Sequence, residues 1–146
     1  MEQKIFRGGN LNCEMKERVT HFDHVQIAAP PGCEKAAREF YGEILGLREI
    51  EKPEALRARG GCWFQCGSQQ LHVGVEKDFR PAKKAHPAFV TADLDELRRA
   101  FVTRGLKVLE DPNIPDKRRF FTEDPWGNRL EFIEQEESAS STSHVR

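Results

Sequence analysis

The sequence lacks long apolar runs, an excess of basic charge and a leader-like beginning, and each absence argues against a class of protein. Its uninterrupted apolar stretches are only a few residues long, whereas a membrane-spanning helix needs roughly 20. The formal net charge of -1 argues against a nucleic-acid-binding surface, which is normally strongly basic. The first residues, MEQKIFRGGN, contain no apolar segment of a secretory signal. We therefore expect a cytoplasmic protein that binds neither nucleic acid nor membranes.

Cysteine is sparse, and its spacing does not fit a disulfide or a zinc site. Cys62 and Cys66 fall in one predicted strand, CWFQC, in which four residues separate the two backbones by about 13 Å. A disulfide needs Cα atoms about 4.4–6.8 Å apart, so these two residues cannot pair within the strand. The spacing also differs from the Cys-x-x-Cys of metal and redox motifs. We expect reduced thiols that pack as small apolar residues.

The length and the composition along the chain predict one domain flanked by a poorly ordered segment at each end. A chain of 146 residues with 38% hydrophobic content is long enough to bury a core. Residues 1–19 do not fit the pattern that follows, and we expect a poorly ordered extension there. Residues 136–146 (EESASSTSHVR) are polar and of low complexity, which favours a disordered tail. The domain is therefore predicted to span residues 20–135.

An internal repeat divides this domain into two related units. Residues 46–53 read GLREIEKP and residues 105–112 read GLKVLEDP, at an offset of 59. The pairs Leu71-His72 and Leu130-Glu131 recur at the same offset, and His24 and His86 lie 62 residues apart. Two matches at one offset are unexpected by chance, so we predict a duplication with modules at about 20–80 and 84–135.

Hydrophobic periodicity assigns the same element order, βαβββ, to both units. The first unit is predicted to contain a helix over 34–45, closed by a glycine, and strands over 22–29, 47–51, 61–66 and 70–76. In the second unit, Asp93 with Glu96 resembles a capping box, and the helix it begins ends at Gly105. Its strands are predicted over 86–91, 106–110, 118–123 and 129–134. This pattern predicts an α+β fold in which two tandem βαβββ modules form a curved mixed sheet with helices on the outer face.

Four side chains of types that can bind a metal ion fall on the polar faces of these strands. Side chains alternate across a strand, so His24, His72, His86 and Glu131 lie opposite the apolar residues that face the helices. Taken singly, a histidine on a strand usually has a structural role and is hydrogen-bonded, and a glutamate on a strand is usually exposed to solvent. The repeat changes this reading, because a pseudo-twofold axis would bring all four side chains to one centre. Imidazole and carboxylate together suit one zinc, nickel, manganese, iron or cobalt ion.

The same residues carry a resemblance to the vicinal-oxygen-chelate superfamily, which includes glyoxalases, bleomycin-resistance proteins and ring-cleaving dioxygenases. It extends over residues 20–135 through the segments FDHVQIAAP, REFYGEILGL, LHVGV, HPAFVTADLDEL and DPWGNRLEFIE. The resemblance implies paired βαβββ modules that enclose a divalent ion, held at the positions of His24, His72, His86 and Glu131. It also implies a small-molecule substrate and a homodimer, in which a site can be shared between chains.

Departures from the family pattern leave several activities open. Glyoxalase I usually has a carboxylate at the position of His72, so lactoylglutathione chemistry does not follow. His24, His86 and Glu131 also match the two-histidine, one-carboxylate set of ring-cleaving iron dioxygenases, but a fourth ligand would leave fewer positions for oxygen and substrate. We therefore rank first a glyoxalase-like lyase or isomerase, in which the ion acts as a Lewis acid on vicinal substrate oxygens. A metal-free drug-binding protein of the bleomycin-resistance type, a dioxygenase and a thiol-transferring resistance enzyme are the alternatives.

Side chains near the predicted centre complete the hypothesis. Glu131 is the predicted catalytic residue, on the hypothesis that it moves away from the ion and accepts a proton. The predicted substrate contacts are the inward-facing amide, two aromatic rings and two guanidinium groups of Gln26, Trp63, Phe121, Arg118 and Arg119.

Overall fold

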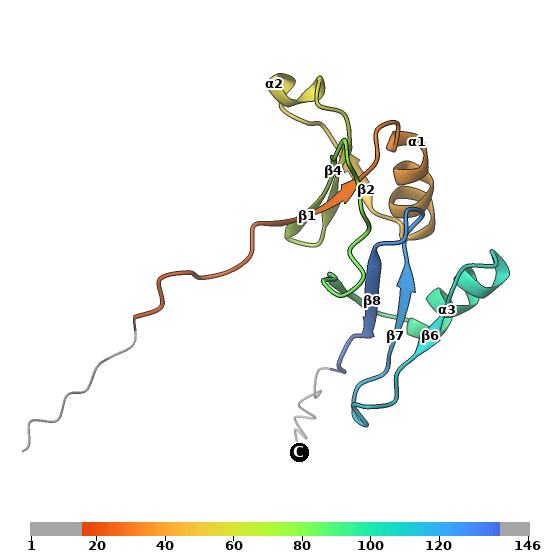
Figure 1. Cartoon of the computed structure of the whole chain (residues 1–146). Helices are drawn as coiled ribbons and strands as arrows, with labels where there is room; N and C mark the ends of the chain where they lie inside the picture. Colours follow the sequence, from red (N-terminus) through yellow and green to blue (C-terminus); the bar gives the residue numbers. More distant parts are fainter. Residues whose placement is uncertain (1–15, 138–146) are drawn as a thin grey trace, which may run out of the picture.

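Two four-stranded sheets, each with helices on one face, make up residues 16–137, the part of the chain that the computed structural model describes (Figure 1). The first module contains β1 (His24–Ala29), α1 (Glu34–Ala37), the π-helical segment η1 (Arg38–Ile44), β2 (Arg48–Ile50), α2 (Glu54–Arg57), β3 (Cys62–Cys66) and β4 (Gln69–Val75). The second contains β5 (Ala88–Thr91), α3 (Leu94–Thr103), β6 (Leu109–Glu110), β7 (Arg119–Glu123) and β8 (Arg129–Glu134). The predicted α+β fold of two tandem βαβββ modules is confirmed, with the short helix α2 as an unpredicted addition.

Strand register reproduces the internal repeat. The sheet orders are β1-β4-β3-β2 and β5-β8-β7-β6, in which β1–β4 and β5–β8 are the parallel pairs. Gln26 lies opposite His72, and Ala88 lies opposite Glu131, so the two pairs of strands have equivalent registers. β1 and β5 are the edge strands of two different sheets in the described chain, and the predicted curved sheet is thus divided in two.

Local sequence explains the helix of the second module. The side chain of Asp93 accepts a hydrogen bond from the backbone N–H of Glu96 at 2.9 Å and so caps α3. Leu97 and Phe101 recur at helical spacing and are buried against the second sheet. Gly105, with a φ of +68°, ends this layer in a conformation that other residues rarely adopt.

One hydrophobic core joins the modules. The ring of Phe40 on η1 contacts that of Phe101 on α3 edge to face, with centroids 5.9 Å apart. Phe101 in turn contacts Phe120 and Phe132, whose side chains point from β7 and β8 toward the helices. Both sheets therefore cover a shared helical layer, and the face of each sheet opposite the helices, here called the inner face, is left for polar residues.

A buried polar cluster, here called the inter-module clamp, consists of Tyr41, Asp124 and Asn128. The hydroxyl of Tyr41 donates to Asp124 at 2.8 Å, and the amide of Asn128 donates to Asp124 at 2.9 Å. Asn128 also donates to the carbonyl of Ala28 on β1 and accepts from the N–H of Ala82 in the linker. The turn between β7 and β8 is thereby fixed against the first module.

Several further expectations can be compared with residues 16–137. Cys33, Cys62 and Cys66 are free, as expected for reduced thiols, and burial raises the pKa of Cys62 to about 11. Cys13, most of the predicted extension and most of the predicted tail lie outside the described residues. Among the described helices, none has the length and apolar character to cross a membrane.

Candidate metal centre

Parallel pairing of β1 with β4 brings two predicted ligands together in the first module. Gln26 lies opposite His72, and His24 lies two residues before Gln26 on the same strand. His24 is therefore the diagonal neighbour of His72 on the same inner face. The two imidazole rings stack with centroids 4.2 Å apart and planes inclined by 17°. On its other side, His72 stacks on Trp63 of β3 at 3.7 Å and 4°. The inner face of the first sheet therefore carries a three-ring stack.

In this stack, each histidine has one ring nitrogen occupied by a hydrogen bond. Nδ1 of His24 lies 2.8 Å from the carboxylate of Asp23, which leaves its Nε2 available, and Nε2 of His72 lies 2.9 Å from the Gln70 amide oxygen. Burial, reinforced by the neighbouring His24, lowers the pKa of His72 and favours its neutral form. A metal ion lies in the plane of an imidazole that binds it. Nearly parallel stacked rings cannot share one ion, so one of them must turn before both can bind.

The second module joins His86 with Glu131. His86 lies two residues before β5, rather than in the predicted strand over 86–91, and its Nε2 is 2.9 Å from Oε2 of Glu131 on β8. Nδ1 of His86 is 2.9 Å from the carbonyl oxygen of Lys84. A proton on Nδ1 donates to that carbonyl, as is typical of metal-binding histidines, and directs Nε2 at the carboxylate, to which Nε2 donates a hydrogen bond when no ion takes the place of the Nε2 proton.

Glu131 is buried and remains ionised. Only 7% of its side chain is exposed, and Arg119 Nη1 donates to its Oε1 at 2.9 Å. Burial opposes ionisation, but the hydrogen bonds from Arg119 and His86 outweigh it, and the pKa of Glu131 lies below its ordinary value. A carboxylate held in this way is a good metal ligand and a weak proton acceptor.

The four predicted ligands thus form two pairs, one in each module, and within one chain the two pairs do not meet at a single centre. Among residues 16–137, no three His, Cys, Asp or Glu side chains lie close enough to hold an ion. The separation arises because β1 and β5 belong to different sheets. His24 and His86 nevertheless line the same cavity of about 820 Å³, which lies between the edge strands and is bounded by the β3–β4 turn and the linker.

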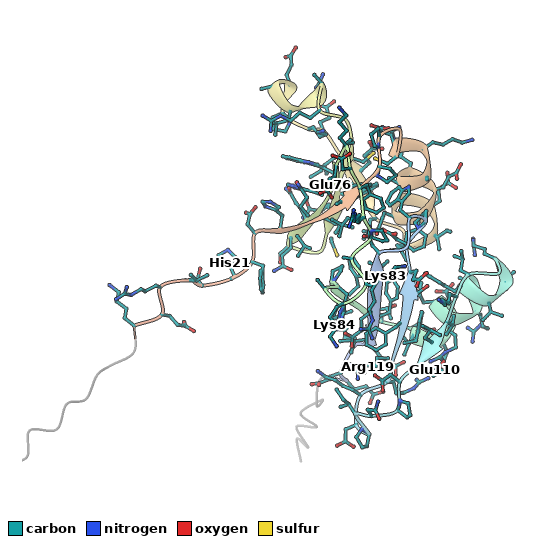
Figure 2. All side chains as sticks on the ribbon, in the orientation of Figure 1. His21, Glu76, Lys83, Lys84, Glu110 and Arg119 are labelled. Atoms are coloured by element: carbon teal, nitrogen blue, oxygen red, sulfur yellow. The ribbon has the colours of Figure 1, made fainter. Side chains whose placement is uncertain are left out.

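The predicted substrate residues fall into two groups. Gln26, Trp63, Phe121 and Arg119 lie on the inner faces beside the histidines, and Phe121 meets the ring of His86 edge on at 5.4 Å. Arg118 is placed apart from them, since it pairs with Asp95 and Glu134. Figure 2 shows His21 on the extended segment before β1.

Several supporting residues escaped the sequence analysis. Asp23 and Gln70 orient the histidines of the first module, and Asp111 accepts a 3.0 Å hydrogen bond from Nη2 of Arg119. The spacing of Gln70 two residues before His72 on a strand is a signal that was available. Asp111 lies in the loop between β6 and β7, where periodicity carries no information about side-chain direction.

Comparisons with known proteins identify the family of the chain. The model of the Glyoxalase/Bleomycin resistance protein/Dioxygenase superfamily matches residues 21–132. A glyoxalase family protein from Bacillus anthracis is similar in structure, with a TM-score of 0.80, 52% identity, and coverage of 84% of this chain and 100% of that one.

More distant structures share the fold. The lactoylglutathione lyase from Agrobacterium tumefaciens has a TM-score of 0.65 at 19% identity, over 81% of this chain and 96% of its own. A glyoxalase/dioxygenase from Nostoc punctiforme has a TM-score of 0.65 at 20% identity, over 94% of this chain and 100% of its own. No curated protein sequence shows significant similarity.

Proposed function

Because the chain belongs to the Glyoxalase/Bleomycin resistance protein/Dioxygenase superfamily, we propose that it is a divalent-metal-dependent, glyoxalase-like enzyme. The ion, a zinc, nickel, manganese, iron or cobalt ion, is held by His24, His72, His86 and Glu131 and supplies Lewis-acid chemistry for a small substrate with vicinal oxygens. The observation that carries the proposal is the pair formed by His86 and the buried Glu131, whose Nε2 and Oε2 atoms face each other at 2.9 Å.

The spacing of this pair suits adjacent ligands of one ion. His86 Nε2 and Glu131 Oε2 are 2.9 Å apart. Two ligands at right angles, each about 2.1 Å from an ion, are separated by about 3.0 Å. A modest turn of the imidazole lets both atoms bind the same ion. In the other module, a turn of one stacked ring brings His24 and His72 into the same relation.

A second copy of the chain supplies the other half of the centre in this proposal. β1 and β5 each have one unpaired edge in the described chain, and such edges favour pairing with another strand. Apolar side chains at or beside these edges are exposed: Phe22 before β1 at 74%, Val25 on β1 at 40% and Val90 on β5 at 68%. All three line the cavity. The two edges do not pair with each other in the described chain, so closure between two chains is favoured. The partner would then be a second copy in a homodimer.

The protein's own residues would bind and orient the substrate. Trp63 and Phe121 offer apolar walls on either side of the centre, and the Gln26 amide on the inner face can donate to a substrate oxygen. Arg119 holds Glu131 ionised. We accordingly propose metal binding as the main role of Glu131, because a carboxylate kept ionised in this way is a weak acceptor for a substrate proton.

One observation favours a second candidate, the ring-cleaving dioxygenase. His72 is already engaged on one face by Trp63 and through Nε2 by Gln70. If this histidine keeps its contacts, His24, His86 and Glu131 remain as the two-histidine, one-carboxylate set that holds iron(II) and leaves three positions open. A His72→Gln variant separates the two activities, because it should weaken binding of zinc or nickel only if His72 is a ligand.

A complementation experiment tests both the metal and the shared site. His24→Ala and His86→Ala chains carrying different affinity tags are co-expressed and purified over both tags, and bound manganese is measured by calorimetry. If each site uses two chains, one site of every mixed dimer is intact, and about one ion binds per dimer against about two for the wild type. Each variant alone should bind none. A metal-free mixed dimer would rule out the shared site. A wild-type protein that binds no metal would rule out the enzyme and leave the drug-binding alternative.

A further inference from the structure

The two oxygens of the Glu131 carboxylate have different partners. Oε2 faces His86 Nε2, whereas Oε1 accepts a hydrogen bond from Arg119 Nη1, both at 2.9 Å. Resting on the metal site proposed above, we propose that Arg119 is a positioning residue that keeps Glu131 a one-oxygen ligand. Oε1 stays occupied by the guanidinium, and only Oε2 is free to bind the ion.

Arg119 is held too firmly to follow the carboxylate if it turns. Its Nη2 donates to Asp111 at 3.0 Å, so the planar guanidinium is fixed between two carboxylates. The side chain is only 13% exposed. Its guanidinium carbon also lies 5.2 Å from the centre of the Phe121 ring. These contacts hold the Arg119 guanidinium in place, and with it the Oε1 atom to which it donates.

The consequence follows from the number of coordination positions. An ion with six positions and four protein ligands has about two left, which matches a substrate that binds through two vicinal oxygens. A carboxylate that binds through both oxygens takes one further position and leaves about one. By holding Oε1, Arg119 preserves the position that the second substrate oxygen needs.

Arg118, the neighbour of Arg119, provides a matched control. It carries the same charge at the adjacent position, but it pairs with Asp95 and Glu134 instead of Glu131. Replacing either arginine by methionine removes one positive charge and keeps an unbranched side chain. An effect confined to position 119 therefore comes from the contacts of Arg119 with Glu131 and Asp111, and not from the loss of one positive charge.

The experiment measures how many water molecules bound manganese retains, by water proton relaxation of the Mn²⁺-loaded protein, together with Mn²⁺ affinity by calorimetry. We expect Arg119→Met to lose one coordinated water relative to the wild type while its affinity is equal or higher, because the released Oε1 joins the ion. Arg118→Met should match the wild type in both. A merely structural role of Arg119 predicts the opposite pattern, with weaker binding and an unchanged water number, and that result would overturn the inference.

Two further measurements keep the result interpretable. Arg119→Met leaves Asp111 without its partner, so the double variant Asp111→Asn/Arg119→Met is measured in parallel and must show the same loss of one water. Circular dichroism checks that both fold. An unchanged water number in a folded double variant overturns the role of Arg119 and leaves the proposed metal site standing. Absence of Mn²⁺ binding by the wild type overturns both.

Discussion

The side-chain amide of Asn128 donates a 2.8 Å hydrogen bond to the carbonyl oxygen of Ala28, and this bond ties the turn after β7 to the edge strand β1. Asn128 is 3% exposed, and its other contacts are with Asp124 and the linker residue Ala82. The relative position of the two ligand pairs therefore depends in part on a buried side chain that belongs to neither pair.

Replacing Asn128 by alanine should destabilise the protein, because several buried polar groups lose their partners together. We expect the free energy of unfolding to fall by about 2–4 kcal/mol, measured by urea denaturation. Asn113→Ala, at an exposed position in the β6–β7 loop, is the control and should change it by less than about 0.5 kcal/mol. Equal stability of the two variants would argue against the clamp.

Tyr41 should remain protonated at alkaline pH in the folded protein. Burial, with the adjacent Asp124 carboxylate and its hydrogen bond, raises the pKa of Tyr41 well above 10.0. Above pH 10 the unfolded chain loses the phenolic proton and the folded chain keeps it, so stability falls as pH rises. Tyr41 is the one tyrosine of the sequence, and tyrosinate absorbance at alkaline pH therefore reports on it alone.

The matching control is Tyr41→Phe, which should lose the alkaline decrease in unfolding free energy. In urea the wild-type absorbance should titrate near the ordinary pKa of about 10. A native protein that titrates there as well would show that the hydroxyl is accessible and that the clamp is open in solution.

His86→Ala should abolish binding of the proposed metal while the fold is kept. The side chain lies before β5 on the inner face and is 26% exposed, so little core packing is lost. Calorimetry with Mn²⁺ measures binding, and thermal unfolding without metal measures the fold. His21→Ala, on the segment before β1, is the control and should bind as the wild type does. Unchanged affinity in His86→Ala would remove this residue from the site.

Gly61→Ala and Gly67→Ala separate steric overlap from backbone strain. Both glycines have a positive φ, +84° and +59°, so both variants carry the strain of a left-handed alanine, about 1–2 kcal/mol. A Cβ at position 61 would in addition overlap the carbonyl oxygen of Val73 on β4, whereas a Cβ at position 67 would meet nothing within 4 Å.

We therefore expect Gly61→Ala to lower the free energy of unfolding by about 2–3 kcal/mol more than Gly67→Ala does. Chemical denaturation of the two variants in the same buffer gives the difference. Equal losses would mean that the approach of residue 61 to β4 is looser than the structure has it.

Much of the fold could be read from the chain because it is encoded locally. The alternation of apolar and polar residues assigned inward and outward faces, the offset of 59 between Leu71-His72 and Leu130-Glu131 indicated the duplication, and the Asp93 cap marked the start of α3. The register in which Gln26 faces His72 and Ala88 faces Glu131 agrees with that repeat. The stack of Trp63 on His72 and the hold of Arg119 on Glu131 were not predictable, because they depend on neighbouring strands and side-chain conformations.

The sequence by itself determined that there are two similar modules and that each brings two histidine or glutamate side chains to its inner face, since periodicity and repetition are properties of the chain alone. Only the tertiary structure decided that these pairs lie on separate sheets. That outcome depends on long-range contacts between the modules, such as the packing of Phe40 on Phe101 and the hydrogen bond between residues 28 and 128, which leave no trace in local pattern.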